Sequence, residues 1–313
     1  SIPGGWGAAA TSLFSNSFYK ILPDFNARIQ LKKSESLTFN YAMRTQFTDI
    51  SKIAEGLVLN SYNSIFSGNN EIQNAISHNL NLNYFSFNLF NYTNVYARLS
   101  YNKSIDQIRN LTTFESVVAT SSPFNSAFAD ENLSANARFQ RQFGKLRASL
   151  KGGFNYSKFN QFIQSSETPS LSESYSQSYG ATIRTSFKQA PNVELGYNYS
   201  FSENILGSIN STTNTKAPFI DIDALILKSF TFRTKYTNNT FSDDRGGLNK
   251  YEFWNASLAY KKDQDSKWEF ELKATNLLDT KSQNQSNTGN ISISTTEYFI
   301  QPRFITFRLV YDL

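Results

Sequence analysis

Apolar and polar residues alternate strictly toward the end of the chain. Between Trp268 and Thr275, and again between Thr306 and Leu313, every second residue is apolar or aromatic, and most residues between them are polar. A repeat of two residues is the period of a β-strand whose two faces have different surroundings. The sequence therefore predicts two strands here, separated by a long polar segment.

The same alternation recurs upstream in pairs of strands. The first predicted hairpin joins Phe25–Lys32 to Leu37–Gln46, and the second covers residues 79–102. Four more pairs follow, with short turns at Gln142–Lys145, Lys188–Asn192, Leu227–Ser229 and Lys262–Lys267. Longer segments rich in Ser, Asn, Thr and Asp separate the pairs, near residues 48–75, 106–130, 159–175, 204–217, 241–250 and 278–300. Short turns that alternate with long loops are typical of bacterial outer-membrane barrels.

We therefore predict an all-β fold, a transmembrane antiparallel outer-membrane β-barrel with about 13 or 14 strands present. Residues 23–313 are expected to form the barrel strands and their long extracellular loops, and the last strand runs toward the periplasm. Residues 1–22 are expected to be an extracellular loop, or one extra strand around Thr11 to Phe18. An odd number of strands would mean that earlier strands of the barrel are absent from this sequence.

The two faces of the predicted strands differ in charge. A cation that faces lipid at the bilayer midplane costs about 2–4 kcal/mol, so a shift of the strands by one residue would cost tens of kcal/mol. The apolar face is therefore predicted to face lipid, with Trp254, Trp268 and Tyr311 at the membrane interfaces. The cations predicted to face the lumen, where they could contact a plug or a solute, are Arg28, Arg44, Arg98, Arg138, Arg147, Lys151, Arg184, Arg233, Lys235, Lys273 and Arg308.

Composition agrees with a strand-rich membrane protein. Aromatic residues make up 15% of the chain while Asn, Ser and Thr dominate between them, which favours strands over helices. No run approaches the ~18 apolar residues that a membrane-spanning helix needs. The absence of cysteine excludes disulfides and cysteine-based metal sites. The net charge of +5 is spread singly along the strands, so nucleic-acid binding is not expected.

Three segments of the chain form recognisable motifs. The first is Gly68-Asn69-Asn70-Glu71-Ile72, which leads into the Asn-Leu-Asn-Leu-Asn-Tyr strand of Asn79–Tyr84, and the others are Lys273–Asp279 and Arg308–Tyr311 at the close. Together they resemble the C-terminal barrel portion of TonB-dependent receptors, within the large outer membrane β-barrel family, in which Lys273–Asp279 is similar to the end of the penultimate strand. The chain departs from the family pattern in two places, because Gly68-Asn69 is not followed by the usual Pro and Leu and the last residue, Leu313, is not aromatic.

The resemblance implies a complete barrel of about 22 strands around a plug. This chain would then lack about nine strands, the plug and the segment that contacts a TonB-type energy coupler. The implied function is import, across the cell outer membrane, of a substrate too large for porins. Segments 49–75, 106–130 and 278–300 would contact the substrate or a surface lipoprotein lid. Two alternatives remain open: a passive, anion-preferring pore of about 14 strands, and a structural docking barrel within a larger outer-membrane assembly.

No catalytic, cofactor-binding or metal-binding residue is predicted, and an enzyme is not expected. His78 is the only histidine and no Gly-x-Ser-x-Gly motif is present, so it is interpreted as a surface residue near the headgroups. The acid pairs Asp221/Asp223 and Glu269/Glu271 are expected to form salt bridges on the inner face, with Arg233, Lys235 and Lys273 as partners. The segment Ser242–Gly247 lacks the ligand spacing of a calcium loop and is interpreted as a solvated turn.

Overall fold

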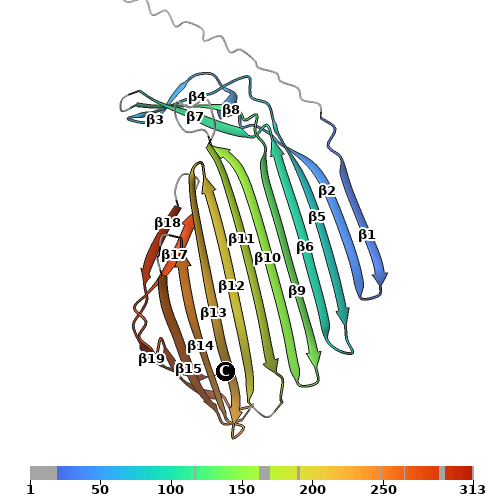
Figure 1. Ribbon diagram of the computed structural model, residues 1–313, viewed down its shortest axis with the longest axis vertical. Helices are drawn as coiled ribbons and strands as arrows, with labels where there is room; N and C mark the ends of the chain where they lie inside the picture. The colour runs from blue at the N-terminus through green and yellow to red at the C-terminus, as the bar shows by residue number, and fades with distance from the viewer. Residues whose placement is uncertain are drawn as a thin grey trace, which may run out of the picture.

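The computed structural model describes residues 20–115, 118–161, 170–188, 191–244, 246, 248–263, 265–288 and 293–311. Within them the chain is almost entirely β-structure, dominated by one large, curved antiparallel sheet (Figure 1). The all-β prediction is therefore confirmed. Residues 1–19 lie outside the described part, so the extra strand around Thr11 to Phe18 stays a prediction.

The large sheet has thirteen strands among the described residues, and each is antiparallel to its neighbours. Their order in the sheet is their order in the chain. They are β1 (Asp24–Lys32), β2 (Glu35–Gln46), β5 (Ala75–Asn88), β6 (Thr93–Ile105), β9 (Asp130–Phe143), β10 (Leu146–Gln161), β11 (Ser170–Thr185), β12 (Asn192–Leu206), β13 (Ile209–Ile226), β14 (Phe230–Asp243), β15 (Leu248–Lys261), β16 (Trp268–Thr275) and β19 (Phe304–Tyr311). The edges, β1 and β19, are not paired with each other.

Two predicted long loops are wrong. Segment 204–217 is mostly strand, because β12 and β13 are joined by Gly207 and Ser208 alone, with Gly207 at φ +57°. Segment 241–250 is likewise shortened by the ends of β14 and β15. These strand ends are rich in Ser, Thr and Asn, which hid them from a search for alternating apolar residues. Their backbones nevertheless pair in register, Ser211 with Asn204 and Thr213 with Ser202.

The segments predicted as two separate long loops, 49–75 and 106–130, form one small sheet above the large one (Figure 1). Its order is β3 (Leu57–Ser61), β4 (Ser64–Ser67), β8 (Val118–Asn125) and β7 (Ile108–Glu115), preceded by the short helix α1 (Ile50–Ile53). Strands β4 and β8 are parallel and come from the two different segments. Segment 278–300 also contains a hairpin, β17 (Ser282–Thr288) with β18 (Ile293–Phe299).

The small sheet is anchored by buried residues at its junction with the large one. Ile72 is 3% exposed and Pro123 is fully buried. Asn69 donates a 3.0 Å hydrogen bond from Nδ2 to the carbonyl oxygen of Pro123. The Gly68 segment singled out in the sequence therefore fastens one surface segment onto the other.

The register keeps the same residues on the same face across the whole sheet, since directly opposed residues project to one side. One row on the apolar face runs from β2 to β12 through Leu37, Tyr84, Ala97, Ala137, Gly152, Tyr179 and Tyr199. A row on the opposite, polar face runs from β9 to β13 through Arg138, Lys151, Gly180, Asn198 and Ala217. No register shift occurs between β2 and β16, so the two faces never exchange.

The large sheet is a single layer without a packed core. The buried hydrophobic residues of the described chain are Ile72, Ala75, Ala224 and Phe241. Large apolar side chains are instead left exposed on the apolar face, such as Leu150 at 56% and Phe307 at 65%. No helix in the described ranges has the length and apolar character required to span a membrane.

Candidate functional site: the basic inner face

The polar face, called the inner face below because the sequence predicts that it lines a lumen, carries a basic hollow of about 600 Å³. It is formed by three neighbouring rows of residues that are paired from strand to strand between β9 and β14. Five cations line it: Arg138, Arg147, Lys151, Arg184 and Lys235. All five belong to the set predicted from the sequence to face the lumen, and the fold brings them to one place.

Small residues create the floor of the hollow. Gly180 on β11 lies directly opposite Lys151, and a Cβ at Gly180 would be 2.2 Å from Lys151 Cε. The Lys151 side chain therefore lies across Gly180. On β12, Gly196 lies opposite Phe219, and a Cβ there would be 2.3 Å from the Phe219 ring. The two glycines thus leave the space that a long side chain from the next strand occupies.

Phe219 is an aromatic residue on the inner face, and most of its neighbours in the hollow are polar. Its ring, lying over Gly196, supports the Lys235 ammonium group at 5.1 Å from the ring centroid. This is the geometry of a cation–π interaction. Lys235 on β14 therefore leans toward β13, while Lys151 on β10 leans toward β11. Both ammonium groups approach the middle of the hollow from opposite sides.

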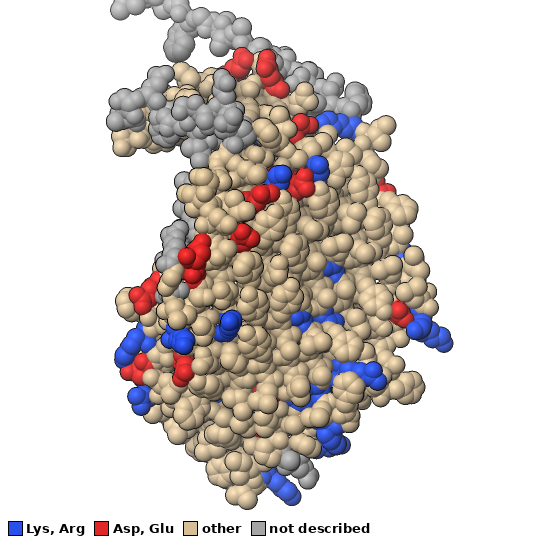
Figure 2. Space-filling view, viewed as in Figure 1, with Lys and Arg blue, Asp and Glu red and all other residues tan. Residues whose placement is uncertain are grey.

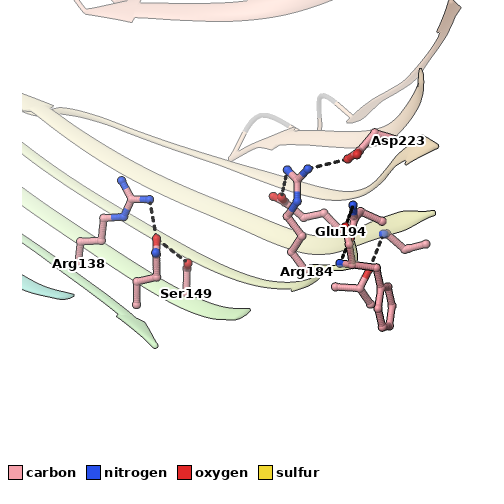
Figure 3. Close-up of polar contacts among 10 residues, drawn as sticks. Arg138, Ser149, Arg184, Glu194 and Asp223 are labelled. Atoms are coloured by element: carbon pink, nitrogen blue, oxygen red, sulfur yellow. Dashed lines mark hydrogen bonds and ion pairs between the residues drawn. The ribbon is translucent and has the colours of Figure 1, made fainter. Parts of the chain in front are cut away.

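The Arg184 side chain on β11 contacts Glu194 on the neighbouring strand β12 and, beyond that strand, Asp223 on β13 (Figure 3). Its guanidinium group is 2.6 Å from Asp223 Oδ1 and 3.4 Å from Glu194 Oε2. The inward salt bridge predicted for Asp223 is therefore present, but its partner is Arg184 and not Arg233, Lys235 or Lys273. Arg184 lies directly opposite Arg147, and like charges in opposed positions repel. Its side chain accordingly turns away from β10, toward the carboxylates on β12 and β13.

The other four cations of the hollow have no such partner. In the described chain, no carboxylate lies within ion-pair distance of Arg138, Arg147, Lys151 or Lys235. Arg138 donates to Gln140 Oε1 at 3.2 Å, an oxygen that Ser149 also approaches at 3.5 Å (Figure 3). Among the residues that line the hollow, two buried side-chain atoms lack a hydrogen-bond partner, Arg147 Nε and Asn198 Oδ1.

The remaining predicted cations are dispersed over the same face. Arg44 and Arg98 line a second hollow of about 570 Å³ with many asparagines, where Arg98 donates to Asn81 Oδ1 at 3.3 Å. Arg308 pairs with Glu271 at 2.9 Å, as an inward ion pair within the wall. The others lie on this face by register and outside the first hollow: Arg28, Arg233 and Lys273. That the face encloses a lumen stays a prediction.

The three aromatics predicted at membrane interfaces lie on the apolar face. Trp268 and Tyr311 are directly opposed at the short-turn end, with ring centroids 4.6 Å apart, and Lys267 lies 5.8 Å from the centroid of the Tyr311 ring. Trp254 lies midway along β15, 43% exposed, and donates from Nε1 to Thr234 Oγ1 at 2.8 Å. The next residue on its face, toward the start of β15, is Glu252, so Trp254 lies at the margin of the apolar run on that strand.

A charged row on the apolar face was missed by the sequence analysis. Lys103, Glu131, Lys158 and Glu173 are directly opposed in succession from β6 to β11, and Lys103 lies 3.5 Å from Glu131. Figure 2 shows acidic side chains in an oblique row across the upper part of the sheet, with basic ones mostly lower down. The sequence does contain a signal for this row, because each of these strands carries one charged residue just beyond the end of its run of alternating apolar residues.

Tyrosines lie immediately below this charged row and point their hydroxyl groups toward it. Tyr101 donates to Glu131 at 3.1 Å and Tyr156 donates to Glu173 at 2.9 Å. On β2, the Tyr41 hydroxyl is 2.8 Å from His78 Nδ1. His78 lies opposite Lys103 and so extends the charged row to β5.

Three places in the described chain bear on metal binding and on the single histidine. No group of three or more His, Asp or Glu side chains among them could hold a metal ion. In the segment Ser242–Gly247, Arg245 and Gly247 lie outside the described residues, while Asp244 accepts a hydrogen bond from the Thr212 amide at 3.1 Å. His78 has its tyrosine partner and no neighbouring nucleophile among its described contacts.

The fold and this face define a class of protein in structural terms, an almost all-β chain dominated by one large antiparallel sheet that is apolar on one side and basic on the other. In comparisons with known proteins, no family model, no curated protein and no solved structure matches the chain.

Proposed function

We propose that the chain forms part of the wall of a transmembrane β-barrel in the bacterial outer membrane and that this barrel serves transport. The observation that carries the proposal is the constant register, which keeps an apolar face and a basic face apart over the twelve strands from β2 to β19. Transmembrane barrels require this alternation, with apolar residues toward lipid and polar residues toward the interior.

The height of the apolar band on β9 agrees with the proposal that the sheet spans a membrane. On β9, Glu131 and Arg141 are on the apolar face, ten residues apart (141 − 131), and the outward residues between them are Leu133, Ala135, Ala137 and Phe139. At about 3.4 Å per residue and a tilt of about 40°, ten residues span about 26 Å across a membrane. The apolar band of outer-membrane barrels is about 25 Å tall.

The single-layer architecture also favours lipid over water. A sheet with an apolar face is stable in water only when a second layer covers that face. Here the buried hydrophobic residues of the described chain all lie at, near or beyond the ends of strands, and side chains such as Leu195 and Leu258 remain exposed on the apolar face. Lipid acyl chains would cover all thirteen strands at once, whereas a protein partner would need an equally wide apolar surface.

We further propose that the barrel belongs to a TonB-dependent type of importer. The resemblance of three sequence segments supports this, and so do the unpaired edges of β1 and β19. In this proposal about nine further strands close the barrel, a plug fills it, and a TonB-type protein supplies energy. The sheet of β3, β4, β7 and β8 would then stand outside the cell, where a substrate or a lipoprotein lid makes first contact.

A passive, anion-preferring pore is a second candidate, favoured by the four inner cations that have no carboxylate partner. An uncompensated positive field attracts anionic solutes into a pore. A plugged importer should be closed in planar lipid bilayers, whereas the passive pore should conduct and prefer anions. A plug encoded upstream in the full-length coding sequence would support the importer.

Single cysteines provide the test of the membrane arrangement, because the natural chain has none. Leu150→Cys places a thiol on the apolar face, and Lys151→Cys places the next thiol on the inner face. Each is labelled with bimane after reconstitution in vesicles that contain brominated lipids. We expect strong quenching at position 150 and little at 151. Equal quenching at the two positions would contradict the proposed arrangement.

A further inference from the structure

We propose that the basic hollow on strands β9 to β14 is a binding subsite for a multivalent anion that carries hydroxyl groups, such as an acidic oligosaccharide. The proposal rests on the proposed transport function for its biological meaning, and names the class of solute for this part of the wall. The hollow of about 600 Å³ lies within the volume range of small-molecule sites.

The first argument is the convergence of two lysines. Lys151 extends over Gly180 and Lys235 rests on the Phe219 ring, so the two ammonium groups lean toward each other over β11 to β13. Free lysine side chains on an open face would minimise repulsion by spreading apart. An anion between them converts a repulsive arrangement into an attractive one.

The second argument is the pair of opposed arginines. Arg147 and Arg184 face each other on β10 and β11, and only Arg184 has carboxylate partners, Glu194 and Asp223. The Nε of Arg147 is buried without an acceptor. A buried donor without a partner loses the free energy of its hydrogen bond to water. A ligand carboxylate or phosphate oxygen would be the missing acceptor.

The third argument concerns the hydroxyl groups of the ligand. Asn198 lies opposite Gly180, with its Oδ1 2.9 Å from the position of a Cβ there, and this oxygen is buried without a donor. Ser149, Thr182 and Thr237 add hydroxyl groups to the lining. An anion without hydroxyl groups, such as sulfate or a fully ionised tricarboxylate, can only accept hydrogen bonds, whereas a sugar acid can also donate to Asn198. This favours a hydroxylated anion over a simple one.

The cations are too far apart for a small ion. Lys235 is on β14 and Lys151 on β10, four strands away, and neighbouring strands are about 4.8 Å apart. Although both side chains lean inward, a ligand that reaches Arg138 and Lys235 together must extend across several strands. A chain of negatively charged sugars meets this requirement.

The test is isothermal titration calorimetry of the protein expressed from its full-length coding sequence and reconstituted in lipid nanodiscs, with trigalacturonate as the probe. Maltotriose provides a neutral sugar of similar length, and propane-1,2,3-tricarboxylate provides three carboxylates without hydroxyl groups. We expect trigalacturonate to bind more tightly than both, with an affinity that falls as KCl is raised. Equal binding of maltotriose would overturn the role of charge, and equal binding of the tricarboxylate would overturn the role of the hydroxyl groups.

Three variants locate the binding. Lys151→Met and Lys235→Met keep most of the apolar stem and should each weaken trigalacturonate binding about tenfold or more. Gly180→Val leaves the charge unchanged but occupies the space of the Lys151 side chain, and should weaken binding similarly. Lys33→Met, in the turn between β1 and β2, is the matched control and should bind like the natural chain. Equal weakening by Lys33→Met would show a general charge effect and overturn the site.

Failure of this proposal is distinguishable from failure of the proposed function. Bimane quenching at positions 150 and 151 reports the membrane arrangement without any ligand. If position 150 is quenched and trigalacturonate does not bind, the barrel proposal stands and the anion subsite is wrong. If neither position is quenched while binding persists, the subsite stands and the membrane proposal is wrong.

Discussion

The backbone amide of Asn276 donates a 2.8 Å hydrogen bond to Oδ1 of Asn255, and so ties the end of β16 to the middle of β15. Asn276 is 5% exposed and has a left-handed backbone, φ +51°. Its side chain accepts from the Thr280 amide at 2.8 Å and donates to the carbonyl oxygens of Thr280 and Gln301, each at 2.9 Å. The Lys273–Asp279 segment therefore ends its strand through this asparagine.

Replacement of Asn276 should destabilise the C-terminal strands. Asn276→Ala loses three side-chain hydrogen bonds and places alanine at a positive φ, so we expect the free energy of unfolding to fall by about 2–4 kcal/mol. Asn276→Gly tolerates the backbone and loses only the hydrogen bonds, so its effect should be smaller. Urea unfolding in lipid vesicles, followed by tryptophan fluorescence, measures both. A glycine variant less stable than the alanine variant would contradict the role of the backbone.

Asp279 gives a pH dependence at the same turn, beyond the end of β16. Hydrogen bonds from the Lys281 side chain and then from the Arg303 amide hold the pKa of Asp279 below its ordinary value of 3.8. A lowered pKa means that the carboxylate stabilises the fold fully above 3.8, and that this stabilisation is lost as the pH falls through the folded-state pKa.

We therefore expect Asp279→Asn to lower the urea midpoint at about pH 7, with the difference from the natural chain shrinking near pH ~3. The measurement is the unfolding midpoint of both proteins at the two pH values. Asp244→Asn serves as a control, since it removes a carboxylate from a different turn. A difference that grows toward acid would refute the assigned direction.

Two adjacent residues on β9 test which face meets lipid. Ala135 is on the apolar face near the midpoint between Glu131 and Arg141, and Asn136 is on the inner face. Ala135→Arg should cost about 2–4 kcal/mol in vesicles, because it buries a cation near the bilayer midplane. Asn136→Arg adds the same charge to a basic, polar face and should cost much less. Similar costs at both positions would argue against a lipid-facing side.

Gly68 tests the junction of the two surface segments. A Cβ at this position would lie 2.1 Å from the Ala54 carbonyl oxygen, so backbone must move. Gly68→Ala should destabilise the small sheet locally, by about 1–3 kcal/mol, and trypsin should cleave after Lys52 faster. Gly152→Ala, where the added Cβ meets Tyr179 at an ordinary 3.9 Å, should leave the cleavage rate unchanged. Unaltered cleavage in Gly68→Ala would show that the junction tolerates a side chain.

The sequence was sufficient to predict most strands of the large sheet because alternation of apolar and polar residues carries the information. Trp268 to Thr275 alternates without exception, and the short turns leave little freedom for a shift in register. The upper ends of β12 and β13 were missed because Ser211 and Thr213 pair through their backbones, which pattern reading does not detect. The parallel pairing of β4 with β8 was missed because nothing local to either segment points to the other.

For the candidate site, the sequence predicted the sign and the face of the inner cations, and missed how they are arranged. That Lys151 lies on Gly180 and Lys235 on Phe219 depends on which residues oppose each other between strands. The preference of Asp223 for Arg184 over Arg233 depends on the repulsion between Arg184 and Arg147. Such choices require the register of four strands at once, which alternation along one strand does not contain.

The parallel pairing of β4 with β8 also bears on the order of folding. Ser64 and Ala119 are directly paired although they are 55 residues apart (119 − 64), whereas the hairpins of the large sheet join neighbours in the chain. Closing such a loop is entropically costly until β5 and β6 have brought its ends together. The small sheet should therefore assemble last. In a chain that inserts into the outer membrane, these two segments would lock together only after both had crossed, which would oppose their return.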